Sequence, residues 1–172
     1  EESLLFGELH VTTTQGETVI VTDESWQCAP NPLTFGNIYD GERYDANLEI
    51  ENWCAPSCTY ANWQPVKRNT TTNLGAIPAR RSLPVKAKHI ITPKQIITPK
   101  NELVFDLGQN ITGWFTFMAD LPAGVELRVQ TGELLQDDCF YRDNLRTALS
   151  EYRYISTGKK AFIRPIATFY GF

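Results

Sequence analysis

The feature of the sequence that most limits its fold is an alternation of apolar and polar residues with a period of two. The alternation, or a dense apolar run of strand length, occurs at 4–11, 17–23, 102–108, 113–120, 124–132, 151–157 and 161–172. Successive side chains of a β-strand point to opposite faces, so this period indicates strands buried on one face. Only the segment DNLRTALSEY (143–152) could form one or two helical turns. An all-β fold is predicted.

The turns between these segments indicate how the strands connect. The polar stretch TTTQG predicts a hairpin of 4–11 with 17–23, Pro122-Ala123-Gly124 predicts an antiparallel hairpin of 113–120 with 124–132, and GKK predicts pairing of 151–157 with 161–172. The segment 51–82 reads as a long surface connection, and the prolines of ITPKQIITPK (91–100) limit ladder pairing. About ten strands with turns every 8 to 12 residues are typical of an antiparallel two-sheet β-sandwich of jelly-roll type. We predict one such domain over residues 1–172.

Composition excludes some classes of partner. The net charge is −4, which gives no basic surface for nucleic acid or an anionic membrane. No apolar run approaches the ~20 residues of a membrane helix, and the first residues, EESLLFGELH, lack the basic start of a secretion signal. We therefore expect a soluble chain that binds neither nucleic acid nor membrane.

The metal-binding and catalytic side chains form no recognisable motif. Zinc is disfavoured because the only histidines are His10 and His89, although disulfides remain open among Cys28, Cys54, Cys58 and Cys139. The chain contains no nucleophile elbow, no phosphate-binding glycine loop and no His-Glu-x-x-His. Twenty acidic residues make chance carboxylate pairs unavoidable, so no active site is inferred. The large aromatics Trp26 and Trp114 are expected in the core.

Seven short motifs occur in a fixed order along nearly the whole chain. They are TDESWQC (22–28), NIYDGERYDANLE (37–49), NWQPV (62–66), FDLGQNITGWFTF (105–117), LPAGVELRVQTGELL (121–135), NLRTA (144–148) and ATFYGF (167–172). Together they resemble the accessory β-domains that precede the catalytic domain of bacterial α-L-rhamnosidases. Asp-Leu-Gly-Gln-Asn-x-x-Gly-Trp followed by Pro-Ala-Gly is the most specific part of that resemblance.

The resemblance implies a non-catalytic role for this chain. The family hydrolyses terminal α-L-rhamnosides with carboxylates on a helical barrel, which would lie beyond Phe172. The chain is then expected to be excised from a larger glycoside hydrolase, to be inert alone, and to have the downstream catalytic domain as its partner. A periplasmic or secreted location follows from the family only.

Some relatives use the matching jelly roll as a calcium-dependent rhamnose-binding module, and this resemblance implies a candidate site. The calcium-binding and sugar-binding aspartate falls on Asp40, a proline carbonyl ligand on Pro93 and the sugar-packing tryptophan on Trp63. The family's asparagine falls on Gly41, which removes an oxygen ligand unless Asp45, Asn47 or water substitutes. The preferred hypothesis is therefore a structural module that packs on the catalytic domain. The alternative is a calcium-dependent module that binds L-rhamnose or rhamnose-containing glycans.

Overall fold

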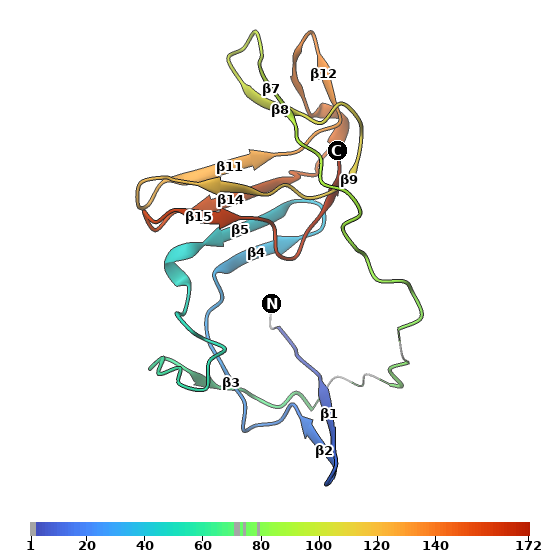
Figure 1. The fold of residues 1–172 in the computed structure, drawn as a ribbon, viewed down its shortest axis with the longest axis vertical. Coiled ribbons are helices and arrows are strands. Elements are labelled where there is room, and N and C mark those ends of the chain that lie inside the picture. Colours follow the sequence, from blue (N-terminus) through green and yellow to red (C-terminus); the bar gives the residue numbers. More distant parts are fainter. Residues whose placement is uncertain (1–2, 71–72, 74, 79) are drawn as a thin grey trace. The chain divides into compact units, whose positions relative to one another are not determined.

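The regular elements of the chain are β-strands and single turns of 3-10 helix. The computed structural model describes residues 3–70, 73, 75–78 and 80–172, and among them both helical segments are three residues long, too short to cross a membrane. The predicted all-β class is confirmed. The chain divides into two compact units, residues 1–30 with 50–83 and residues 31–49 with 84–172. The jelly-roll arrangement and the single domain over 1–172 stay predictions, and each unit is described by itself (Figure 1).

The first unit contains the predicted N-terminal hairpin. Strands β1 (Glu8–Thr13) and β2 (Gly16–Val21) pair antiparallel, which confirms the reading of 4–11 with 17–23. The short strand β3 (Gln27–Cys28) pairs antiparallel with β6 (Gln64–Pro65). Trp26 is 41% exposed, so the expectation that it fills the core is wrong. Its indole N–H donates to the carbonyl of Val21 at 3.0 Å, so the polar edge of this exposed ring has a partner.

The second unit contains the other elements, which pair at several places along the chain. They are β4 (Leu33–Asn37), β5 (Gly41–Asp45), η1 (Ala46–Leu48), β7 (Lys94–Ile97), β8 (Leu103–Asp106), β9 (Thr112–Gly113), β10 (Phe117–Ala119), β11 (Glu126–Gln130), β12 (Leu134–Gln136), β13 (Cys139–Tyr141), η2 (Asp143–Leu145), β14 (Glu151–Ile155), β15 (Ala161–Ile163) and β16 (Tyr170–Gly171). The turn η2 falls inside 143–152, where a helical turn was expected.

A four-stranded sheet in the order β11-β14-β5-β4 forms the centre of this unit (Figure 1). β14 pairs antiparallel with β11 but parallel with β5, so the expectation of purely antiparallel pairing is wrong at this one ladder. Alternation along β14 places Tyr152 and Tyr154 on one face, where Ile163 of β15 and Ala119 of β10 pack against them. Half-buried Phe115 completes this core; its ring meets that of Tyr152 edge to face, with centroids 5.5 Å apart.

In the C-terminal half, the predicted strand pairs are wrong because each strand pairs with a different partner. Pro122–Gly124 does form a turn, in which the Val125 N–H donates to the Pro122 carbonyl at 3.3 Å. However, β10 before the turn pairs with β15, while β11 after it pairs with β14. The turn is held instead by Ser156 at the end of β14, whose carbonyl accepts from the Gly124 N–H at 2.8 Å. Likewise the GKK turn connects β14 to β15, which lie in different sheets.

The proline repeat of 91–100 allows more pairing than predicted. β7 lies between the two prolines of the repeat and pairs antiparallel with β8 over four residue pairs. The prolines Pro93 and Pro99 flank this strand rather than interrupting it, so no ladder donor is lost.

A buried carboxylate connects β5 to the segment after β15. Glu42 is 2% exposed, and its carboxylate accepts the backbone N–H groups of Ile166 at 2.9 Å, Ala167 at 2.7 Å and Thr168. The Thr168 hydroxyl donates to the same carboxylate at 2.7 Å and accepts from the Tyr170 hydroxyl at 3.1 Å. These donors supply the hydrogen bonds without which a buried carboxylate would be strongly destabilising.

The parallel ladder of β5 and β14 requires a glycine at its first position. Gly41 has a φ of +110°, and a Cβ placed on it would lie 1.8 Å from the backbone oxygen of Glu151 and 2.8 Å from the Tyr170 hydroxyl oxygen. Because a backbone oxygen cannot move aside as a side chain can, the two strands approach this closely only where one of them lacks a Cβ.

Replacing Glu42 with glutamine tests the buried carboxylate. Glu42→Gln should lower the free energy of unfolding by about 2–3 kcal/mol, because charge-assisted bonds to backbone N–H groups are lost and the new amide N–H₂ meets other donors. Denaturant unfolding followed by circular dichroism measures the change, with exposed Glu133→Gln as the control. A change no larger than that of the control would show that this interaction does not hold residues 166–168.

Replacing Gly41 with alanine tests the close approach of the strands. Gly41→Ala should cost about 3 kcal/mol or more, since strain at positive φ is combined with overlap against backbone. Gly124→Ala is the matched control, because Gly124 has φ +77° in the same unit but open space around its Cβ position. Equal losses of stability in the two variants would mean that backbone strain alone, and not the contact with Glu151, makes glycine necessary.

Candidate functional site

Asp40 lies in the turn between β4 and β5, and the turn is tied to the start of β14. The Asn37 side-chain oxygen accepts the N–H groups of Tyr39 at 2.7 Å and Asp40 at 3.2 Å. The Asp40 carboxylate accepts the Leu149 N–H at 3.3 Å, and its backbone carbonyl accepts the Glu151 N–H at 3.0 Å. One carboxylate oxygen is therefore already used in holding the turn.

Gly41 has a structural explanation that the sequence could not supply. The resemblance treats it as an asparagine that has been lost from a ligand set. The close approach to Glu151 shows that no residue with a Cβ fits at this point of the backbone without displacing β14. This contact explains why a glycine stands here, while the weakening of a calcium site by the missing asparagine oxygen stays a prediction.

The other two residues of the predicted site lie in different parts of the chain. Pro93 belongs to the same unit as Asp40 and is exposed immediately before β7. Trp63 belongs to the first unit, where its ring meets that of Tyr60 edge to face with centroids 5.8 Å apart. The carbohydrate and calcium roles of Asp40, Trp63 and Pro93 stay predictions.

Metal-binding side chains do not gather in the described part of the chain. Among those residues, no group of three or more His, Cys, Asp or Glu side chains is placed to hold a metal ion. The four cysteines are free thiols: Cys28 and Cys54 are exposed, Cys58 is half-buried and Cys139 is buried. No disulfide joins any two of these four cysteines.

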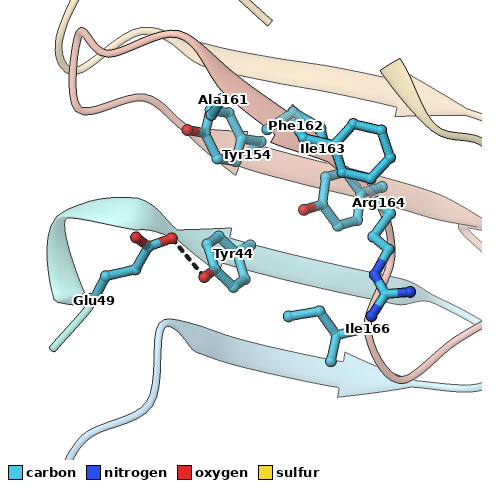
Figure 2. A pocket seen from close by; sticks show the side chains of 9 residues that line it. Tyr44, Glu49, Tyr154, Ala161, Phe162, Ile163, Arg164 and Ile166 are labelled. Carbon is cyan, nitrogen blue, oxygen red and sulfur yellow. Dashed lines mark hydrogen bonds between the residues drawn. The ribbon is translucent and has the colours of Figure 1, made fainter. Parts of the chain in front are cut away.

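A pocket of about 230 Å³ opens in the second unit between the tyrosine face of the central sheet and β15 (Figure 2). Its lining is rich in aromatic and aliphatic side chains and includes one carboxylate and one guanidinium: Tyr44, Glu49, Tyr152, Tyr154, Ala161, Phe162, Ile163, Arg164 and Ile166. Register places Tyr44 directly beside Tyr154 on the parallel strands, and their rings stack with centroids 6.2 Å apart. Two tyrosine rings therefore line the sheet side of the pocket.

The phenol groups of this wall are held in their neutral form. The Tyr44 hydroxyl donates to a Glu49 carboxylate oxygen at 2.7 Å. Burial, followed by this bond to Glu49, raises the pKa of Tyr44 well above its ordinary value. Burial, followed by the nearby charge of Glu42, likewise raises the pKa of Tyr152. At neutral pH these hydroxyls act as hydrogen-bond donors and acceptors and not as charges.

The Tyr152 hydroxyl has no hydrogen bond within the described residues, whereas the Tyr44 hydroxyl donates to Glu49. Tyr152 is 2% exposed, and no fully buried side-chain polar atom in that part of the chain lacks a partner. Its hydroxyl must therefore retain some access to the pocket that its side chain lines. A nearly buried phenol with unused hydrogen-bonding capacity is unusual in a protein interior.

The opposite face of the central sheet carries charged side chains. Register aligns three arginines across three strands, Arg128 of β11, Arg153 of β14 and Arg43 of β5. Two carboxylates offset the positive charge of this row. Glu126 lies 3.4 Å from Arg153 and 3.8 Å from Arg43. Glu151 is bonded to Arg153 and lies 3.8 Å from Arg128.

Glu151 titrates lower than an ordinary glutamate despite its burial. Burial raises the pKa of Glu151, but the hydrogen bonds from Arg153 and Gln130, together with the nearby arginine charges, lower that pKa to below its usual range. Because its arginine partners are exposed, these ion pairs fix side-chain positions more than they stabilise the fold.

Sequence reasoning missed the pocket. The alternation in ERYD (42–45) and EYRYI (151–155) does place tyrosines on one face of each strand. However, nothing in either segment indicates that the two strands are neighbours, because they lie more than 100 residues apart and pair in parallel.

Comparison with known proteins identifies two family models along the chain. The α-L-rhamnosidase N-terminal domain matches residues 1–89, and the bacterial α-L-rhamnosidase concanavalin-like domain matches residues 96–172. An α-L-rhamnosidase of Formosa agariphila is 33% identical over all of this chain and 19% of its own length. This chain thus spans about one fifth of the length of that relative.

Solved structures agree with this assignment. The α-L-rhamnosidase of Streptomyces avermitilis, complexed with L-rhamnose, superimposes with a TM-score of 0.90 at 28% identity, over 97% of this chain and 17% of that one. The α-L-rhamnosidase of Dictyoglumus thermophilum gives a TM-score of 0.81 at 31% identity, over 91% of this chain and 18% of that one. Because the first family model covers more than half of the residues, the chain belongs to the family of α-L-rhamnosidase N-terminal domains.

Proposed function

We propose that this chain is a non-catalytic accessory region of an α-L-rhamnosidase that packs on the catalytic domain of the same polypeptide and supports it. The observation that carries the proposal is the match of its two halves to the N-terminal and concanavalin-like domains of that family, over about a fifth of the relatives' length. Hydrolysis of terminal α-L-rhamnosides is then the work of a downstream helical barrel.

The chemistry of the pocket supports a non-catalytic role. Glycoside hydrolysis generally needs two carboxyl groups, one on each side of the scissile bond. The pocket in the second unit is lined by a single carboxylate, Glu49, and that group is already hydrogen-bonded to Tyr44. This arrangement can bind a ligand but offers no second carboxylate to act as base or nucleophile.

An exposed apolar surface supports packing against a further domain. Met118 of β10 and Phe162 of β15 are directly opposite each other on the outer face of that strand pair, and they are 55% and 62% exposed. Ile166 and Phe169, which follow in the chain, are also exposed. Exposed apolar side chains that lie together, as Met118 and Phe162 do, commonly mark a protein interface when they form a larger patch.

Replacing Met118 with lysine in the parent polypeptide tests this packing. If the catalytic domain covers β10, Met118→Lys should destabilise the parent by about 1–3 kcal/mol, because the ammonium group would lose water without gaining a partner. In the 172-residue chain alone the same change should have little effect. Thermal unfolding measures the stability of the parent and of the isolated chain. Hydrolysis of nitrophenyl α-L-rhamnoside near the transition temperature reports the loss of folded parent.

Ile97→Lys is the matched control, since Ile97 is 59% exposed on β7 of the same unit. Equal effects of Met118→Lys in the parent and in the isolated chain would contradict packing at β10.

The alternative function is calcium-dependent binding of L-rhamnose at Asp40, Pro93 and Trp63. The support for it is that the Streptomyces avermitilis enzyme, similar over 97% of this chain, was solved as a complex with L-rhamnose. In this chain, Asp40 retains one carboxylate oxygen that accepts no hydrogen bond from the described residues. A periplasmic or extracellular location is proposed with either function, on the ground of the family alone.

Titration with calcium and L-rhamnose separates the two functions. The accessory function predicts no calcium-dependent heat of rhamnose binding to this chain by calorimetry. Asp40→Asn keeps the size of the side chain but removes its charge, and so serves as the control. Rhamnose binding that requires calcium and disappears in Asp40→Asn would establish the alternative instead.

A further inference from the structure

We propose that the pocket between the central sheet and β15 is a calcium-independent binding site for a single sugar ring in the pyranose form. It is separate from the site predicted at Asp40 and does not rest on the accessory function. The feature that points to a ligand is the Tyr152 hydroxyl, which lines the pocket on a side chain that is 2% exposed and has no hydrogen bond within the described residues.

The size and walls of the pocket fit one ring. Its volume of about 230 Å³ is below the ~300–1,000 Å³ of pockets that hold drug-sized ligands, so an oligosaccharide cannot be enclosed. The stacked rings of Tyr44 and Tyr154 form one wall, and Phe162 and Ile166 also line the pocket. Aromatic faces of this kind suit the C–H face of a pyranose, which is apolar on one side and bears hydroxyl groups at its rim.

The polar groups of the pocket suit those hydroxyls. The Tyr152 hydroxyl can donate and accept, and Glu49 can accept a further bond beside the one from Tyr44. Figure 2 shows Glu49 beside Tyr44 at one end of the labelled group and Arg164 near Ile166 at the other. Arg164 makes no ion pair with any described residue, so its five donors remain for ligand oxygens.

The ligand set excludes a requirement for calcium at this pocket. One carboxylate and one guanidinium have no net charge together, and calcium needs six to eight oxygen ligands that this lining does not gather. Recognition here depends on stacking and on neutral or charge-assisted hydrogen bonds. The guanidinium of Arg164 can also pair with the carboxylate of an acidic sugar.

Ligand-observed NMR on the 172-residue chain tests the site. The probes are the methyl glycosides of L-rhamnose, D-galactose and D-galacturonic acid, each titrated in the presence of EDTA. We expect at least one probe to show saturation transfer and to shift the Tyr152 and Phe162 ring resonances. Tyr152→Phe, which removes only the hydroxyl group, should weaken that binding about 3- to 10-fold.

Two further variants keep the test decisive. Arg164→Gln changes an exposed side chain that the fold does not use, and it should weaken binding by a similar factor, most of all for the galacturonide. Tyr141→Phe, in β13 outside the pocket, is the matched control and should bind like the native chain.

Absence of binding by all three probes would overturn the proposal. The remaining explanation would be that a side chain of a neighbouring domain fills the pocket. Binding that is equal in the native, Tyr152→Phe and Arg164→Gln proteins would also overturn it, because the sugar would then lie elsewhere. The titrations use the 172-residue chain alone because Phe162 and Ile166, which line the pocket, also belong to the exposed apolar surface proposed to pack on the catalytic domain. The Met118→Lys comparison in the parent tests that packing with a different variant.

Discussion

The buried carboxylate of Glu42 is the interaction on which the second unit depends. It lies on β5 and bonds three consecutive backbone N–H groups of residues 166–168, more than 120 residues further along the chain. The Thr168 amide would otherwise be a buried donor without an acceptor, and the carboxylate would be a buried charge without compensation. Because each side satisfies the other, Glu42 and Thr168 can be buried together. The segment after β15 carries Ile166 to the pocket and Tyr170 to its pairing in β16.

The position of β5 in turn explains why the family models and the compact units divide the chain differently. The first model ends at residue 89, yet residues 31–49 belong by contact to the unit that contains 84–172. β5 enters the central sheet beside β14 as its parallel neighbour, and Gly41 makes the close approach possible. A segment of the N-terminal region thereby supplies one wall of a core whose other strands come from the concanavalin-like region.

The candidate site at Asp40 and the pocket illustrate two different kinds of evidence. Asp40 and Trp63 were assigned by resemblance, and the structure gives Asp40 a structural bond to Leu149 in addition. The pocket was not assigned by any motif, and it follows only from the pairing of β5 with β14 and the packing of β15 above them. Its Tyr152 hydroxyl and Arg164 guanidinium are polar groups of the lining that make no hydrogen bond or ion pair with the described residues.

The sequence by itself determined the all-β class and the location of most strands, because alternation shows which residues share a face. It also determined the N-terminal hairpin of β1 with β2, because a short polar turn brings neighbouring strands together. It also carried the ordered motifs of the family. Only the tertiary structure decided the partners of β10, β11, β14 and β15, and with them the pocket. The Pro122–Gly124 turn is compatible with a hairpin and with a crossing between sheets. Contacts far away in sequence accompany the crossing, such as the bond from the Gly124 N–H to the Ser156 carbonyl. Alternation specifies the face of a strand but not its neighbour, and that is the physical reason why the fold class was predictable and the pocket was not.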